Sequence, residues 1–188
     1  MENKQINLLA HHIAKYFMCD KCDYLWVYKE LMSGGDNLPF LPTLSVKQPW
    51  AHLICAGIKD IENRVWKCPQ KYIGKRVFIH ASGKPVKYDN WYDSPLSNEQ
   101  ILSIPDKMEC KNFTTSAIIG SVVIAGYVIN HEGIWEEKTE VLQDESGLPY
   151  YDNTIYNWVL ANPVLFDEPI TDIKGKLKFW DCSKHIAK

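Results

Sequence analysis

The stretch from Ala117 to Asn130 reads AIIGSVVIAGYVIN and limits the fold more than any other part of the chain. Its β-branched residues predict one long strand, and Gly120 and Gly126 are expected where that strand bends or forms a bulge. Further strands are predicted at 43–46, 57–66, 76–81, 156–165 and 176–182. About half a dozen strands with glycines at bend positions predict an α+β fold that is mainly β, either a small barrel or a strongly curved sheet.

Two short helices are expected to flank these strands. Pro49 suits the first turn of a helix through Trp50 and Cys55, and Gly57 is expected to follow the C-cap of that helix. Ser97 is expected to cap a second short helix that ends at Ile104.

The first 42 residues differ from the rest. Apolar residues recur with helical spacing at Ile6, Leu9, Ile13 and Phe17, and a second apolar stretch covers residues 24–32. We therefore predict a helical N-terminal extension and linker over residues 1–42 and a main domain over residues 43–188. The extension is too small to fold alone, so it is expected to pack on the main domain, to bind a protein partner or to mediate self-association.

Composition excludes several classes of protein. With 46% hydrophobic and 23% charged residues, the chain is globular rather than disordered. No apolar run approaches the ~20 residues of a membrane span, and no secretory signal pattern is seen at the N-terminus. We therefore predict a cytoplasmic protein with no membrane association, and its six cysteines are expected to be reduced.

Cysteine and histidine spacing raises the question of a metal. Cys19 and Cys22 form a CxxC pair shortly after His11 and His12, but a zinc site normally needs a second closely spaced ligand pair. Two cysteines on one helix face are the preferred interpretation, so neither a metal nor a cofactor is predicted.

Charge is unevenly distributed along the chain although the net charge is only −2. Residues 59–87 contain eight basic and two acidic residues, whereas residues 132–152 contain seven acidic residues and Lys138 alone as a base. Such asymmetry is typical of a nucleic-acid-binding face opposed by an acidic face. Two solvated loops on opposite sides of an ordinary domain are the alternative.

Two linked motifs carry a family resemblance. The first is QPW at residues 48–50, and the second is GxKxxExR, formed by Gly57, Lys59, Glu62 and Arg64. The run SVKQPWAHLICAGIKDIENRVW, followed by YIGKRVFIHAS, resembles the ASCH domain (activating signal cointegrator homology) of the PUA-like superfamily. The resemblance covers residues 43–182 and implies a PUA-like pseudo-β-barrel with short flanking helices.

The resemblance also implies a function. ASCH and related domains are associated with RNA or modified nucleobases, and the resemblance places a ligand cleft beside the GxKxxExR segment. Some small bacterial members deacetylate an N-acetylated cytidine with a threonine three residues after the lysine. Glu62 occupies that position here and has no hydroxyl group, so the pattern is closer to the nucleic-acid-binding members.

The local geometry of residues 57–64 sets a condition on this cleft. In a regular strand, alternate side chains face opposite sides, so Lys59 and Glu62 would be separated. A bulge, or a bend after Gly57, is needed to bring them together. Glu62 would then accept from a base amino group or act as a general base, and Lys59 would hold an anion. Arg64 would bind a phosphate or carbonyl, or would form a structural ion pair with Glu62.

We therefore hypothesise a protein that binds RNA or a modified nucleotide in a cleft lined by lysine, glutamate and arginine. The alternative is a hydrolase, either an amidohydrolase on an acylated nucleobase or a ribonuclease, with Lys59 and Glu62 as catalytic residues. A third hypothesis is an adaptor that acts through the N-terminal helices. The candidate nucleotide-binding residues are Gln48, Trp50, Lys59, Glu62, Arg64 and Trp66.

For the remaining candidate side chains, a structural role is the alternative to a role in binding. Gln48 could contact a base edge or cap its own loop, and a tryptophan could stack on a base or belong to the core. His80 is predicted to be an interior histidine because it lies within an apolar strand.

Overall fold

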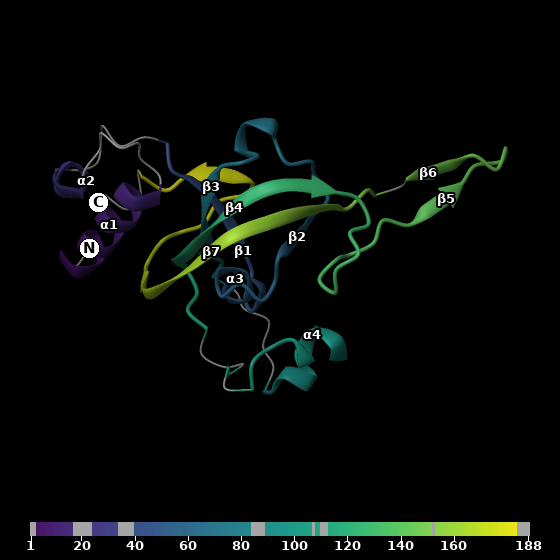
Figure 1. Cartoon of the computed structure of the whole chain (residues 1–188), viewed down its shortest axis with the longest axis horizontal. Coiled ribbons are helices and arrows are strands. Elements are labelled where there is room, and N and C mark those ends of the chain that lie inside the picture. Colours follow the sequence, from purple (N-terminus) through teal and green to yellow (C-terminus); the bar gives the residue numbers. More distant parts are fainter. Residues whose placement is uncertain are drawn as a thin grey trace.

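A six-stranded sheet forms the centre of the protein (Figure 1). The computed structural model describes residues 3–16, 24–33, 40–83, 89–106, 108–109, 113–151 and 153–183. The strand order is β2-β7-β4-β3-β1-β8, and only the pair β1–β3 is parallel. The strands of this sheet are β1 (Pro42–Val46), β2 (Ile61–Arg64), β3 (Arg76–Ala81), β4 (Ala117–Val128), β7 (Tyr156–Ile170) and β8 (Phe179–Asp181).

The sheet bends where the glycines of β4 lie. The register between β4 and β7 shifts between Ile118 and Gly120 and again between Ile124 and Gly126. At Gly120 the neighbouring strand and helix come so close that a Cβ atom would lie 2.2 Å from the carbonyl oxygen of Val164. The predicted bends at both glycines are confirmed.

The curved sheet brings its two edges together. The Arg64 Nη2 at the end of β2 donates a hydrogen bond of 2.8 Å to the Ser45 carbonyl of β1. Trp66, just after β2, packs edge-on against Phe179 of β8 with ring centroids 5.7 Å apart. The protein therefore has a curled, mainly β, barrel-like fold, as predicted, and its core includes the fully buried Trp158.

Both short helices predicted to flank the strands are present, and the end of one of them needs a correction. In α3 (Trp50–Cys55), Pro49 is the N-cap residue, and Gly57 follows the C-cap with a φ of 77°. The helix α4 (Asn98–Leu102) has Ser97 as its N-cap within a full capping box, but it ends before Ile104. A short 3-10 turn, η1 (Gln70–Tyr72), precedes β3.

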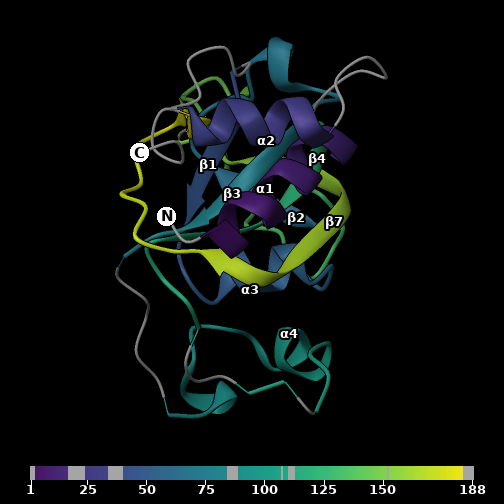
Figure 2. The same cartoon turned by 90° about the vertical axis from the view of Figure 1, so that its left-hand side faces the viewer.

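The two N-terminal helices, α1 (Asn3–Tyr16) and α2 (Tyr24–Met32), lie together at one end of the sheet (Figures 1 and 2). Leu9 and Ile13 of α1 are fully buried in a second hydrophobic cluster that also contains Phe78, Ile118 and Ile170 of the sheet. The helices thus share a core with the strands. Cys19 and Cys22 lie outside the described residues. Within the described residues, no helix is long and apolar enough to cross a membrane.

His12 is the polar side chain buried at this contact between α1 and the sheet. Its Nε2 is hydrogen-bonded to Ser121 Oγ of β4 at 2.9 Å, and its ring lies edge-on to Phe166. Arg76 Nη1 donates to the same Ser121 Oγ at 2.9 Å. Burial, together with the nearby positive charge of Arg76, lowers the pKa of His12 from 6.5 to about 3.

We predict that His12 makes the protein lose stability in acid. The unfolded chain binds a proton at this histidine below pH 6.5, whereas the folded chain does so only near pH 3. The free energy of unfolding should therefore fall as the pH drops through this window. Urea unfolding of wild type and His12→Gln at several pH values measures the effect. The variant should show a shallower acid slope, and identical slopes would contradict the prediction.

The predicted strands differ in extent from the observed ones: β2 and β8 are shorter than the predicted 57–66 and 176–182, and β7 is longer than predicted. The predicted strand 156–165 continues to Ile170 as one strand of 15 residues, β7. Pro163 and Pro169 are tolerated because β2 pairs only with the first residues of β7. Among the described strands, none pairs with that edge of the remaining residues of β7. The acidic segment 132–152 is not simply a loop. It contains the hairpin of β5 (Val141–Gln143) and β6 (Pro149–Tyr151), which projects from the sheet in Figure 1.

A cluster of hydrogen bonds around Thr139 closes the base of this hairpin. The Thr139 hydroxyl donates to the Ile155 carbonyl at 3.2 Å and accepts from the Ile155 N–H at 2.8 Å. The Thr139 N–H in turn donates to the Asn130 side chain at 2.7 Å. The two ends of the hairpin segment are therefore held together beside the sheet.

Candidate nucleotide-binding site

The chain bends between α3 and β2, and this bend decides where Lys59 lies. The N–H groups of Ile58 and Lys59 both donate to the Leu53 carbonyl, at 2.9 and 3.0 Å. The strand β2 begins only at Ile61, so Lys59 is outside the alternating pattern. The bend required after Gly57 is present.

A pocket of about 360 Å³ lies where β2 approaches β1, and we call it the site pocket. It brings together Trp50, Lys59, Glu62 and Arg64 of the predicted binding residues. The other residues that line it are Ser45, Val46, Lys47, Asn63, Ser82, Glu137 and Leu177.

Glu62 and Arg64 form one wall of the site pocket. An oxygen of Glu62 lies 2.8 Å from Arg64 Nη2, the same nitrogen that binds the Ser45 carbonyl. The ion pair predicted as the structural alternative is thus present, and Arg64 also ties β2 to β1, while both side chains line the pocket. Glu62 is 7% exposed, so its contact with Arg64 is only partly screened by water.

Lys59 is an unusually buried lysine, with 4% of its surface exposed. Its ammonium donates to the Ile61 carbonyl and lies 5.9 Å from the centre of the Trp135 ring. Burial lowers the pKa of Lys59 from its ordinary value, and the negative charges of Glu62 and Glu137 partly oppose this shift. The pocket thus contains a buried amine whose charged form is less favoured than that of an exposed lysine.

A buried asparagine holds the segment 131–137 over this amine. Asn157 of β7 is fully buried, and its Nδ2 donates to Asn63 Oδ1 at 2.9 Å and to the Glu137 carbonyl at 3.0 Å. Its Oδ1 accepts from the His131 N–H at 2.9 Å, while Asn63 Nδ2 donates to the Trp135 carbonyl. These bonds fix the segment that carries Trp135 and Glu137.

Asn157→Leu should therefore loosen the pocket wall from a distance. The change leaves three partly buried polar partners without hydrogen bonds, which costs roughly 1–3 kcal/mol of unfolding free energy. The melting temperature should fall by several degrees, and amide exchange should rise in residues 131–137. Exchange that rises equally throughout the sheet would show a general loss of stability and would contradict a local role.

Two predicted residues lie elsewhere. Gln48 is 1% exposed, and its side chain donates to the Thr114 carbonyl at 2.8 Å and accepts from the His52 N–H at 3.0 Å. Trp66 packs edge-on against Trp158 with centroids 4.6 Å apart. Neither residue lines the site pocket, and the geometry favours their structural alternatives, namely a loop cap and a core aromatic.

His80 has the interior position predicted for it. It is 1% exposed, its Nε2 donates to the Ile173 carbonyl at 2.9 Å, and burial lowers its pKa. Among the residues that the structure describes, no group of three or more histidines, cysteines and carboxylates is placed to hold a metal ion.

Sequence reasoning missed the site residues that come from distant segments. Ser45 and Lys47 precede the QPW motif directly, and that proximity was a usable signal. Glu137 and Leu177 are more than 70 residues from the motif in sequence, and only the closing of the sheet brings them to the pocket.

The comparisons with known proteins decide the family. The profile described as "ASCH domain" matches residues 44–170, which include both motifs and the whole of β7. The chain belongs to the ASCH-domain family. Members of this family are in general associated with nucleic acids.

Solved structures of ASCH proteins are also similar to this chain. The ASCH protein of Zymomonas mobilis is 13% identical, with 78% of this chain and 90% of that chain covered and a TM-score of 0.44. A mutant of that organism's ASCH protein is 14% identical, with 71% and 77% covered and a TM-score of 0.39. No curated protein matches the sequence significantly.

Proposed function

We propose that this ASCH protein binds RNA, or a modified nucleotide, with one base in the site pocket. The observation that carries the proposal is the meeting of an indole, three basic side chains and two carboxylates in one pocket of about 360 Å³, a volume within the range of small-molecule sites. Trp50 offers a ring on which a base can stack. Glu62 offers an acceptor for a base amino group, and Arg64 offers donors for a base carbonyl.

The balance of charges supports a base rather than a phosphate inside the pocket. Lys59 and Arg64 are accompanied there by Glu62 and Glu137, so the interior is polar but has little net charge. Lys47 is exposed at the rim and can meet the phosphate of a bound nucleotide. Lys67, Lys71 and Lys75 are exposed outside the pocket and can contact a longer backbone.

A hydrolase remains the second candidate because of Lys59. A lysine whose pKa is lowered by burial gives up its proton more readily than an exposed lysine, and its neutral amine can then act as a general base. Such a group supports an amidohydrolase on an acylated nucleobase, or a ribonuclease, with Lys59 and Glu62 as the reacting groups.

Binding and turnover on one mixed panel test both candidates. The panel contains short single- and double-stranded RNAs and DNAs, together with acetylated and methylated nucleosides. Wild type, Glu62→Ala and the exposed hairpin control Glu145→Ala are compared, and products are read by mass spectrometry. Binding that is lost only in Glu62→Ala, without a product, is the expected result.

The other outcomes are equally informative. A change of substrate mass that needs Glu62 would make the protein a hydrolase. Failure of the wild type to bind any member of the panel, or equal binding by Glu62→Ala, would overturn the proposal.

A further inference from the structure

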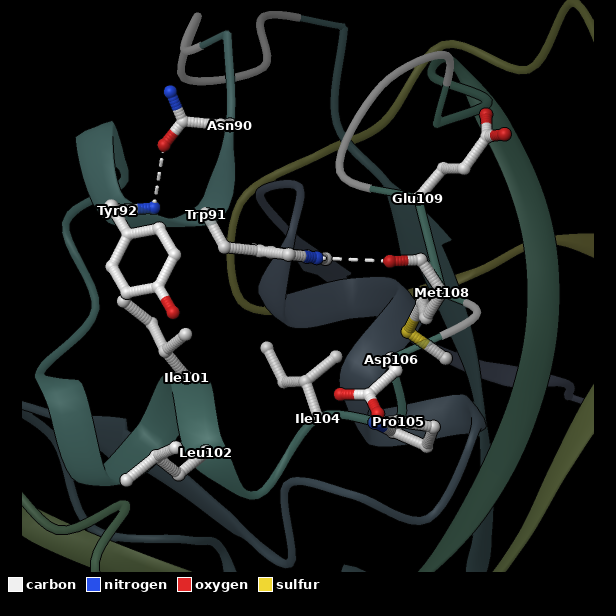
Figure 3. A pocket seen from close by; sticks show the side chains of 10 residues that line it. All are labelled: Asn90, Trp91, Tyr92, Ile101, Leu102, Ile104, Pro105, Asp106, Met108 and Glu109. Atoms are coloured by element: carbon white, nitrogen blue, oxygen red, sulfur yellow. Dashed lines mark hydrogen bonds between the residues drawn. The ribbon is translucent and has the colours of Figure 1, made fainter.

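A second pocket lies in the segment between β3 and β4, outside the sheet (Figure 3). We call it the outer pocket. Its volume is about 450 Å³, and it shares no lining residue with the site pocket. Its lining residues are Asn90, Trp91, Tyr92, Ile101, Leu102, Ile104, Pro105, Asp106, Met108 and Glu109.

Hydrogen bonds hold the walls of the outer pocket in place. The Trp91 indole N–H donates to the Met108 carbonyl at 2.9 Å, as Figure 3 shows. Asn90 caps the short turn η2 (Trp91–Asp93) by accepting from the Tyr92 N–H. On the next wall, Gln100 of α4 donates to the Ile134 carbonyl at 2.8 Å. The pocket is therefore largely formed before any ligand arrives.

The surface of the outer pocket is apolar and open to solvent. Leu102 is 83% exposed and Tyr92 is 77% exposed, while Ile101 and Ile104 are buried below them. In Figure 3, the side chains of Trp91 and Ile104 lie between these exposed residues and the side chains of Asp106, Met108 and Glu109. Aromatic residues and methionine on an exposed apolar patch are typical of protein-binding surfaces.

Acidic residues predominate in the segment that forms this apolar surface. The segment 89–109 contains five acidic residues and one basic residue, Lys107; the acidic residues are Asp89, Asp93, Glu99, Asp106 and Glu109. Two of them, Asp106 and Glu109, belong to the lining itself. A negative rim repels the phosphates of a nucleic acid and attracts a cation. Charge complementarity therefore points to a basic occupant with an apolar group.

We propose that the outer pocket docks a short basic segment of a partner protein. An apolar side chain of that segment enters between Trp91, Ile104 and Met108, and an adjacent lysine or arginine meets Asp106 and Glu109. This inference is independent of nucleotide binding, because the two pockets are separate. It gives the protein a protein-binding surface in addition to its nucleotide site.

Fluorescence anisotropy with three short labelled peptides tests the proposal on the full chain. The first peptide places a leucine or tryptophan between lysines and arginines. In the second, glutamates replace the basic residues, and in the third, serine replaces the apolar residue. Only the first should bind the wild type, and high salt should weaken this binding because the contact includes exposed charges.

Variants of exposed residues locate the contact without threatening the fold. Leu102→Ser should weaken binding of the first peptide by about tenfold, as expected for an anchor residue. Glu109→Gln combined with Asp106→Asn should weaken it several-fold and remove its salt dependence. The matched controls are Leu148→Ser and Glu145→Gln, which change an exposed leucine and an exposed carboxylate of the β5–β6 hairpin.

Each possible result either supports or overturns the proposed peptide-binding role of the outer pocket. Loss of binding in the outer-pocket variants, with normal binding in both hairpin controls, supports the proposal. Failure of the wild type to bind the first peptide overturns it. Equal binding of all three peptides, or a short RNA that competes for the same surface, also overturns it.

Discussion

Lys59→Met is expected to abolish nucleotide binding while leaving the folded protein about as stable as the wild type. The methionine keeps the length of the side chain but removes the ammonium from the site pocket. The lost hydrogen bond to the Ile61 carbonyl costs roughly 0.5–1.5 kcal/mol. Burial of the Lys59 charge destabilises the folded state, as its lowered pKa indicates. Removing that charge should therefore offset the loss of the hydrogen bond.

The pH dependence of stability provides the check on this balance. Because the folded pKa of Lys59 lies below 10.5, the unfolded chain keeps a proton that the folded chain loses as the pH rises. Wild type should therefore gain stability towards pH 10.5, and the variant should lack this part of the gain. Calorimetric titration with the nucleotide that the wild type binds, and thermal melts across this range, measure both effects. A large fall in melting temperature with normal nucleotide binding would show that the role of Lys59 is purely structural.

Gly120→Ala is expected to be the most destabilising single change considered for the fold. The new Cβ would lie 2.2 Å from the Val164 carbonyl oxygen and 2.7 Å from Cys55 Sγ, so β4 would have to separate from β7 or from α3. We expect a loss of more than ~3 kcal/mol in unfolding free energy, or failure to fold. A fall of this size lowers the melting temperature by roughly 6–12 °C in a chain of this length.

Gly126→Ala is the matched control for that change. Gly126 lies on the same strand at the second register shift, and a Cβ there would meet nothing within 4 Å. Thermal melts of the two variants should therefore differ by several degrees. Similar melting temperatures would show that β7 can shift to accept a side chain at Gly120.

Much of the fold was predictable because its signals are local. The run of β-branched residues identified β4, and its two glycines marked the bends that curve the sheet. Proline, apolar spacing and Gly57 defined α3 in the same way. The β5–β6 hairpin was missed because its strands have three residues each and expose Val141 and Tyr150, so no buried face produces a regular pattern.

The candidate site was predictable only in part. Lys59, Glu62 and Arg64 were found together because one short motif contains them, and the need for a bend after Gly57 followed from strand alternation. Gln48 and Trp66 do not line the site pocket, since a polar or aromatic side chain beside a motif can equally belong to the interior. Glu137 was not found, since its place depends on hydrogen bonds of Asn157, a residue near the other end of the chain.

The bonds between Thr139 and Ile155 also define a site for protein engineering. They join the two ends of the hairpin segment at its base. A loop of a different length between these ends changes the entropic cost of loop closure only slightly. Residues 140–154 can therefore be exchanged for a tight turn or for a foreign sequence, such as an affinity tag or a fluorescent sensor insert. The ASCH scaffold thus has a natural insertion point whose occupant is set apart from the sheet.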